Sequence, residues 1–144
     1  MMKIPFPLRL AAVVLLSCSV VFAQEHGPST ELEKAMKAMN KNLRTLKRQV
    51  ADPAKKEENL SLVAAMKKGV EEGLKLQPAK TRDVAEAEKP AYLEKYRSQM
   101  TELGQSIDEL EAAIKADQPE EAEKVFEKLK KQKDNGHKAF APEE

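Results

Sequence analysis

The chain has 144 residues, and its 25 Lys and Arg residues are nearly balanced by 24 Asp and Glu residues. A chain of this length suits one small domain with a single hydrophobic core. The balanced charge argues against a nucleic-acid partner, because proteins that bind phosphate backbones carry a clustered excess of basic residues. The single cysteine, Cys18, excludes a disulfide within the chain.

Residues 1–23 have the features of a cleaved signal peptide. Two basic residues precede an apolar stretch at 10–16, and Ala23 is a small residue at the expected cleavage point. The apolar stretch is too short for a good membrane span, so we expect no membrane association after cleavage. The mature protein is then one domain, residues 24–144, that works outside the cytoplasm. A lipoprotein site at Cys18 is the alternative, although the mature chain would then start with an unusually apolar segment.

Two amphipathic helices are predicted between residues 30 and 76. Thr30 and Glu33 form a capping-box pattern at the start of the first helix. Asp52 and Pro53 end that helix and begin the second, since proline is tolerated in a first helical turn. Apolar residues recur every three or four positions, which indicates one buried stripe on each helix. The expected inward positions are Leu32, Met36, Met39, Leu43, Leu46 and Val50 in the first, and Leu60, Val63, Met66, Val70 and Leu74 in the second.

A polar connection at residues 77–90 precedes two further helices, which a turn at Asp117-Gln118-Pro119 separates. No run of residues alternates with the period of a β-strand. We therefore predict an all-α fold, an antiparallel up-down-up-down four-helix bundle, in which the middle connection is a hairpin and not a crossover. The expected inward positions are Leu93, Tyr96, Met100, Leu103, Ile107, Leu110 and Ile114 in the third helix, and Ala122, Val125, Phe126, Leu129, Lys133, His137 and Phe140 in the fourth.

Met36 and His137 are the candidate functional pair. In an up-down-up-down bundle, the start of the first helix and the end of the last lie at the same end, so these two side chains would face each other across the core. A thioether and an imidazole can close both axial positions of a haem iron. Met39 lies on the same stripe and is a competing thioether. Each residue also has a plain structural interpretation, because Met fills irregular core gaps and a histidine complements the dipole at a helix C-terminus.

The sequence resembles the soluble periplasmic cytochrome b562 family. The similar segments are LEKAMKAMNKNLRTL at 32–46, AAMKKGVEEGLKLQPAK at 64–80 and IDELEAAIKADQPEEAEKVFEKLKKQKDNGHKAF at 107–140. The resemblance implies one b-type haem with Met36 and His137 as axial ligands. The haem is not covalently attached, because the chain has no Cys-x-x-Cys-His motif.

The same resemblance implies roles for three further residues. Lys133 stands where the family has an arginine, and it would meet a haem propionate as a point charge. Tyr96 and Met100 would wall the haem. From the residue types alone, we expect Tyr92 and Tyr96 to pack with their hydroxyls reaching the surface. Gly136 stands where the family has an aromatic residue, which leaves that side of the site less filled.

Two protein ligands leave no open position on the iron, so the resemblance implies a periplasmic electron carrier and not an enzyme. The sequence has no Ser/His/Asp set for nucleophilic catalysis. We expect a monomer that exchanges electrons with redox partner proteins, whose identity the sequence does not give. Two alternatives remain. One is a cofactor-free extracytoplasmic bundle with a binding or chaperone-like role, and the other is a haem sensor or carrier in which only His137 binds iron.

Overall fold

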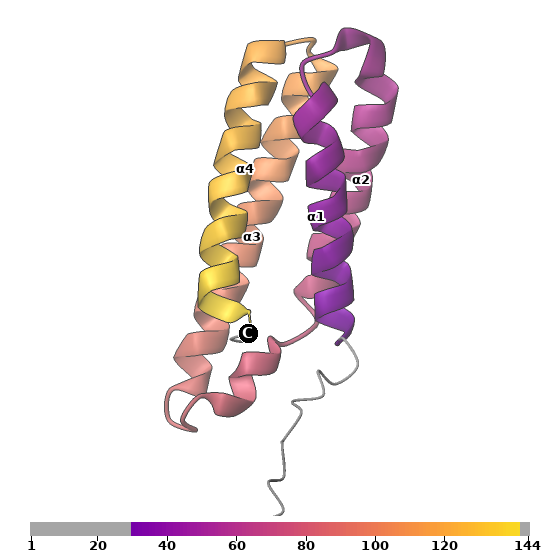
Figure 1. Ribbon diagram of the computed structural model, residues 1–144. Coiled ribbons are helices and arrows are strands. Elements are labelled where there is room, and N and C mark those ends of the chain that lie inside the picture. The colour runs from indigo at the N-terminus through magenta and orange to yellow at the C-terminus, as the bar shows by residue number, and fades with distance from the viewer. Residues whose placement is uncertain (1–29, 142–144) are drawn as a thin grey trace, which may run out of the picture.

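The computed structural model describes residues 30–141, so the predicted signal peptide and Cys18 lie outside the described residues. Every α-helix in this part of the chain runs roughly parallel or antiparallel to the others, and the described residues contain no strand (Figure 1). The predicted all-α four-helix bundle is confirmed. The elements in order are α1 (Glu31–Gln49), the 3₁₀ helix η1 (Pro53–Lys55), α2 (Lys56–Gly73), the 3₁₀ helix η2 (Ala79–Asp83), α3 (Lys89–Lys115) and α4 (Pro119–Phe140).

Three of the four pairs of neighbouring helices in the bundle pack closely against each other. α1 packs against α2, α2 against α3 and α3 against α4, whereas α1 and α4 lack a comparably extensive contact. We call the line between α1 and α4 the seam. Figure 1 shows the start of α1, the end of α4 and the long connection at one end of the bundle, with the two short turns at the other. The middle connection is therefore a hairpin, as predicted.

The helix boundaries follow local capping chemistry. The backbone N–H of Glu33 donates to Thr30 Oγ1, and the backbone N–H of Thr30 donates to a Glu33 carboxylate oxygen, each at 3.2 Å. This is the predicted capping box. Asp52 accepts a hydrogen bond from the backbone N–H of Ala54 at 2.9 Å and so starts the η1–α2 segment. α2 ends at Gly73, before the predicted residue 76, because residues 74–76 continue in a tighter turn.

The core consists largely of the predicted stripes. Burial of these apolar side chains supplies the main driving force for folding. The exceptions lie on helix flanks: Met36, Leu60, Leu74, Leu93 and Lys133 are half-buried, and His137 is exposed. The largest fully buried apolar side chains are Leu46, Val63, Met66, Ile107, Leu110 and Leu129.

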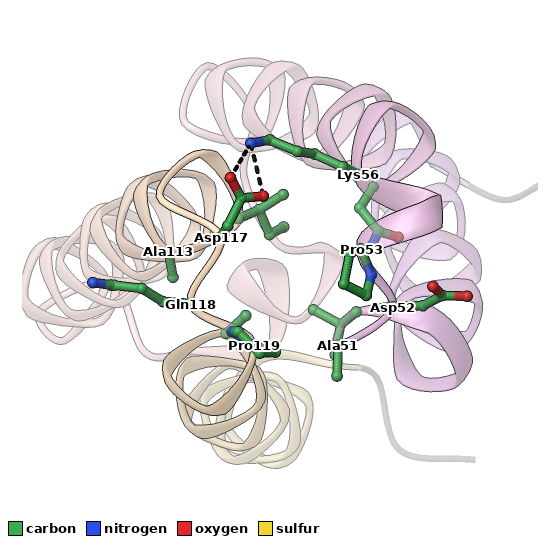
Figure 2. A pocket seen from close by; sticks show the side chains of 12 residues that line it. Ala51, Asp52, Pro53, Lys56, Ala113, Asp117, Gln118 and Pro119 are labelled. Carbon is green, nitrogen blue, oxygen red and sulfur yellow. Dashed lines mark hydrogen bonds and ion pairs between the residues drawn. The ribbon is translucent and has the colours of Figure 1, made fainter.

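At the end of the bundle with the two short turns, one lysine of α2 binds the turn between α3 and α4. Lys56 at the start of α2 donates to both carboxylate oxygens of Asp117, at 2.8 and 2.9 Å (Figure 2). It also donates to the backbone carbonyl of Lys115 at 2.9 Å. Asp117 has a φ of 54°, a left-handed conformation that Asp tolerates better than most residues. The cavity beside this pair, between the two turns, has a volume of about 40 Å³. It has room for water and not for an organic cofactor, and it lies at the end opposite to Met36 and His137.

Candidate functional site

Three side chains from α1 and α3 converge on Gly73 of α2. A Cβ atom at Gly73 would lie 2.7 Å from Met100 Cε, 3.2 Å from Met36 Cε and 3.5 Å from the Tyr96 hydroxyl oxygen. The Tyr96 hydroxyl donates a hydrogen bond to the Gly73 carbonyl oxygen at 2.7 Å. The structure thus brings together three of the five predicted site residues. Gly73 was not predicted from the sequence, although a glycine within a helix, which costs about 1 kcal/mol relative to alanine, was an available sign.

An aromatic cluster closes the same end of the bundle. The Phe140 ring of α4 packs edge-on against Tyr92 and against Tyr96, with ring centroids 5.3 Å apart in each pair. The prediction that the Tyr96 hydroxyl reaches the surface is wrong, because the group is buried on Gly73. Burial raises the pKa of Tyr96 to about 12. Among the described residues the Tyr92 hydroxyl is also buried, and it has no hydrogen-bond partner there.

The two candidate thioethers have different surroundings. Met39 is buried over Gly69 of α2, where its Cγ and Sδ atoms each lie 2.7 Å from the position that a Cβ atom would take. Met36 is half-buried, and its methyl group reaches the Met100–Tyr96 cluster. Met39 is therefore a packing residue between α1 and α2. Met36 is the thioether beside the predicted wall residues.

His137 is exposed, which corrects the prediction that it lies on the inward stripe of the fourth helix. Its neighbour Gly136 faces α3, since a Cβ atom there would lie 3.8 Å from Gln99 Oε1. Successive helical residues are turned by about 100°, so His137 lies on a flank that points away from Gln99. The imidazole has no cover on that flank because α1 and α4 are not closely packed.

A charge effect connects α4 to α1 across the seam. The pKa of Glu127 on α4 is lowered, chiefly by a hydrogen bond from Lys130 and in smaller part by the charge of Lys47 on α1. Glu127 and Lys47 are therefore neighbours across the seam. Met36 lies eleven residues before Lys47, which is three turns, so it shares the Lys47 flank.

Glu127 and Lys47 serve as reference points for the relative depths of the two candidate ligands in the bundle. Met36 lies about 16 Å along α1 from Lys47, and His137 lies about 15 Å along α4 from Glu127, at 1.5 Å per residue. Because the helices are antiparallel, the two distances run toward the same end of the bundle. Met36 and His137 thus lie at similar depth on the two sides of the seam.

Lys133 lies one turn before His137 on α4 and is half-buried. Its Nζ atom is 3.0 Å from a carboxylate oxygen of Asp134. On the α3 side of the same turn, the side-chain oxygens of Gln99 and Gln132 are buried without a hydrogen-bond partner among the described residues. These two glutamines could not be predicted from the sequence, because an isolated polar residue gives no periodic pattern.

Comparison with known proteins supplies the family. The family model described as cytochrome b562 matches residues 31–141, which include all of α1 to α4. The chain belongs to the cytochrome b562 family. Searches of curated proteins and of solved structures gave no match. Cytochromes b562 bind non-covalent b-type haem and are electron carriers.

The residues of this cytochrome b562 are chemically suited to that group. A thioether and an imidazole are a ligand pair for haem iron, and Met100, Tyr96 and Phe140 offer the apolar surface that a porphyrin needs. Gly73 leaves a hollow in α2 that methionine methyl groups occupy here. In the part of the chain that the structure describes, no helix has the length and apolarity to cross a membrane.

Proposed function

We propose that this cytochrome b562 is a periplasmic one-electron carrier that holds one haem between Met36 and His137. Tyr96 and Met100 wall the porphyrin, and Lys133 pairs with a propionate. The observation that supports the proposal is that the start of α1, with Met36, and the end of α4, with His137, lie at the same end of the bundle on the two sides of a loosely packed seam (Figure 1).

Bound haem supplies a ferric–ferrous couple. Met36 and His137 would both bind the iron, so no position would be left for a substrate, and the site suits electron transfer rather than catalysis. The thioether of Met36 favours the ferrous state. The apolar surroundings at Tyr96 and Met100 favour the form with the smaller net charge, so both effects raise the reduction potential.

His137 has to turn toward the seam to meet the iron. An exposed side chain changes rotamer within nanoseconds, so this step is fast. Lys133 is a flexible point charge and orients a propionate less firmly than the planar fork of an arginine. We therefore propose that this chain binds haem in the family's orientation with moderate affinity.

Export, partner and oligomeric state are also part of the proposal. The signal-like residues 1–23 and the family support a periplasmic location. The carrier acts as a monomer, and its partners are redox proteins.

Titration of the purified protein with haemin tests the ligand assignment. We expect a six-coordinate absorption spectrum in both oxidation states, and no binding of carbon monoxide by the reduced wild type. Met36→Ala should give a five-coordinate ferrous iron that binds carbon monoxide, and His137→Ala should lower haem affinity at least tenfold. Met39→Ala is the matched control and should retain the wild-type spectrum. Loss of the sixth ligand in Met39→Ala, and not in Met36→Ala, would overturn the assignment.

A cofactor-free bundle is the second candidate, and the exposure of His137 favours it. In that case Phe140, Tyr92 and Tyr96 are plain core residues at the bundle end. A protein that gains no Soret band with haemin would support this candidate. Carbon monoxide binding to the reduced wild type would instead support the sensor or carrier in which only His137 binds iron.

A further inference from the structure

The nearly neutral net charge conceals a strong separation of charge. Residues 31–49 contain six basic and two acidic residues, and residues 128–140 contain five basic residues and one acidic residue. Residues 50–118 contain eleven basic and fourteen acidic residues. The positive charge is therefore concentrated on α1 and on the second half of α4, the two helices that border the seam.

Ion pairing makes this separation of charge more pronounced. Most lysines of the η1–α2 segment form ion pairs, as in Lys67 with Asp108 and Glu111, each at 2.8 Å. In contrast, six exposed basic side chains on α1 and α4 form no ion pair with any described residue. We call this set the basic seam surface, and it consists of Lys41, Arg44, Lys47, Arg48, Lys131 and Lys138.

Helical spacing places these side chains along the seam. Lys41, Arg44 and Arg48 follow at steps of three and four and so share one face of α1. Arg44 lies one turn before Lys47, the α1 residue that acts on Glu127.

The α4 members of the surface also share one face of their helix. Lys131 and Lys138 lie four and eleven residues after Glu127, which is about one and three helical turns. Both side chains are therefore on the same face of α4 as Glu127. Two rows of positive charge thus border the seam. Lys138 adjoins His137, whereas Lys41, Arg44 and Arg48 lie about 8 to 18 Å further along the bundle than Met36.

We propose that the basic seam surface docks an acidic face of a redox partner protein next to the haem. This inference rests on the proposed function, because docking matters only if the seam holds the cofactor. Complementary charge steers diffusional encounter and can raise association rates by about 10- to 1,000-fold at low salt. A small charged surface without an apolar centre suits the weak, transient complexes of electron-transfer proteins.

The composition of the surface favours a protein over a lipid membrane. Helices that lie on membranes combine basic residues with exposed Trp, Phe or Leu side chains. The exposed residues of α1 and α4 are polar or charged apart from Ala38, and Phe126 and Phe140 are buried.

Stopped-flow reduction of the haem-loaded protein by a reduced plant-type ferredoxin, an acidic redox protein, tests the proposal. One electron passes from the reduced iron–sulfur cluster to the ferric haem. For the wild type we expect a second-order rate constant that falls steeply with ionic strength. The variant Lys41→Glu/Arg44→Glu/Lys138→Glu should react at least tenfold more slowly at low salt. The matched control, Lys75→Glu/Lys95→Glu/Arg97→Glu, makes the same charge change away from the seam and should stay within about twofold of the wild type.

The absorption spectrum of each loaded protein separates the two proposals. Equal slowing of both triple variants, with normal six-coordinate spectra, would overturn the docking surface and leave the proposed function intact. A wild type without a haem spectrum would overturn both. Sedimentation of the wild type with vesicles of phosphatidylglycerol and phosphatidylcholine, lost in the seam variant, would assign the surface to a membrane instead of a protein.

Discussion

At the scale of single residues, Met36 and Met39 show what apolar spacing does and does not determine. Both fit the inward stripe of the first helix, so the sequence alone left the choice of thioether open. The structure separates them because each lies over a different glycine of α2: Met39 over Gly69 and Met36 near Gly73. The spacing could not reveal this difference, since it depends on the register of α1 against α2.

His137 shows the opposite case. Its spacing from Phe126 and Phe140 predicts an inward position, yet the residue is exposed. The inward stripe of a helix is buried only where a neighbouring helix packs against it. α1 does not pack closely against this flank of α4. The sequence predicted which residues matter, but the exposure of His137 depends on how α1 and α4 pack.

Replacement of Gly73 by alanine tests the cluster around Met36. The new Cβ atom would lie 2.7 Å from Met100 Cε and 3.2 Å from Met36 Cε, so both methyl groups have to move. We expect haem affinity to fall about tenfold, or about 1.4 kcal/mol, measured by haemin titration. The control is Gly69→Ala, which displaces Met39 in the same way. An equal loss of affinity in both variants would show that general repacking, and not Met36, is responsible.

At the scale of elements, the helix ends were the most predictable feature. The Thr30–Glu33 capping box and the Asp52 cap form local hydrogen bonds, and a proline marks the helix starts after Asp52 and Gln118, so these features can be read without tertiary information. The end of α2 was less predictable because a tighter turn extends the helix without a break at Gly73.

The capping box fixes the start of the helix that carries Met36. Thr30→Ala removes the acceptor for the Glu33 N–H and should lower the free energy of unfolding by about 1 kcal/mol, measured by urea denaturation. Thr30→Ser keeps the hydroxyl and should retain most of the stability. A Thr30→Ala variant as stable as the serine variant would show that α1 does not depend on this cap.

The ion pairs between α2 and α3 predict a defined response to acid. Hydrogen bonds from Lys115 and from Lys67 lower the pKa of Glu111 to about 2, from an ordinary value of 4.5. A lowered pKa stabilises the folded state at pH values above 4.5, and this contribution is lost as the pH falls toward 2.

Glu111→Gln removes that contribution. Urea denaturation at a series of pH values should show a smaller loss of stability between pH 5 and about 2 for this variant than for the wild type. Glu94→Gln, at an exposed position of α3 without an ion pair among the described residues, is the control and should follow the wild type. Parallel curves for Glu111→Gln and the wild type would contradict the predicted role of Glu111.

At the scale of the whole molecule, topology was predictable and surface charge was not. Short turns force neighbouring helices to be antiparallel, and four amphipathic stripes then have one economical arrangement. The net charge is a sum over the whole chain. It does not show that the fold places the basic helix α1 beside the basic half of α4. The loosely packed seam, the depth match of Met36 with His137 and the bordering basic rows all arise from that arrangement.

Iron K-edge X-ray absorption of the haem-loaded protein tests the central claim most directly, because it reports the atoms bonded to the iron. We expect one sulfur ligand and one imidazole nitrogen in addition to the porphyrin nitrogens, with the sulfur lost in Met36→Ala and retained in Met39→Ala. An iron without a sulfur ligand in the wild type, or a sulfur that persists in Met36→Ala, would contradict ligation by Met36 across the seam.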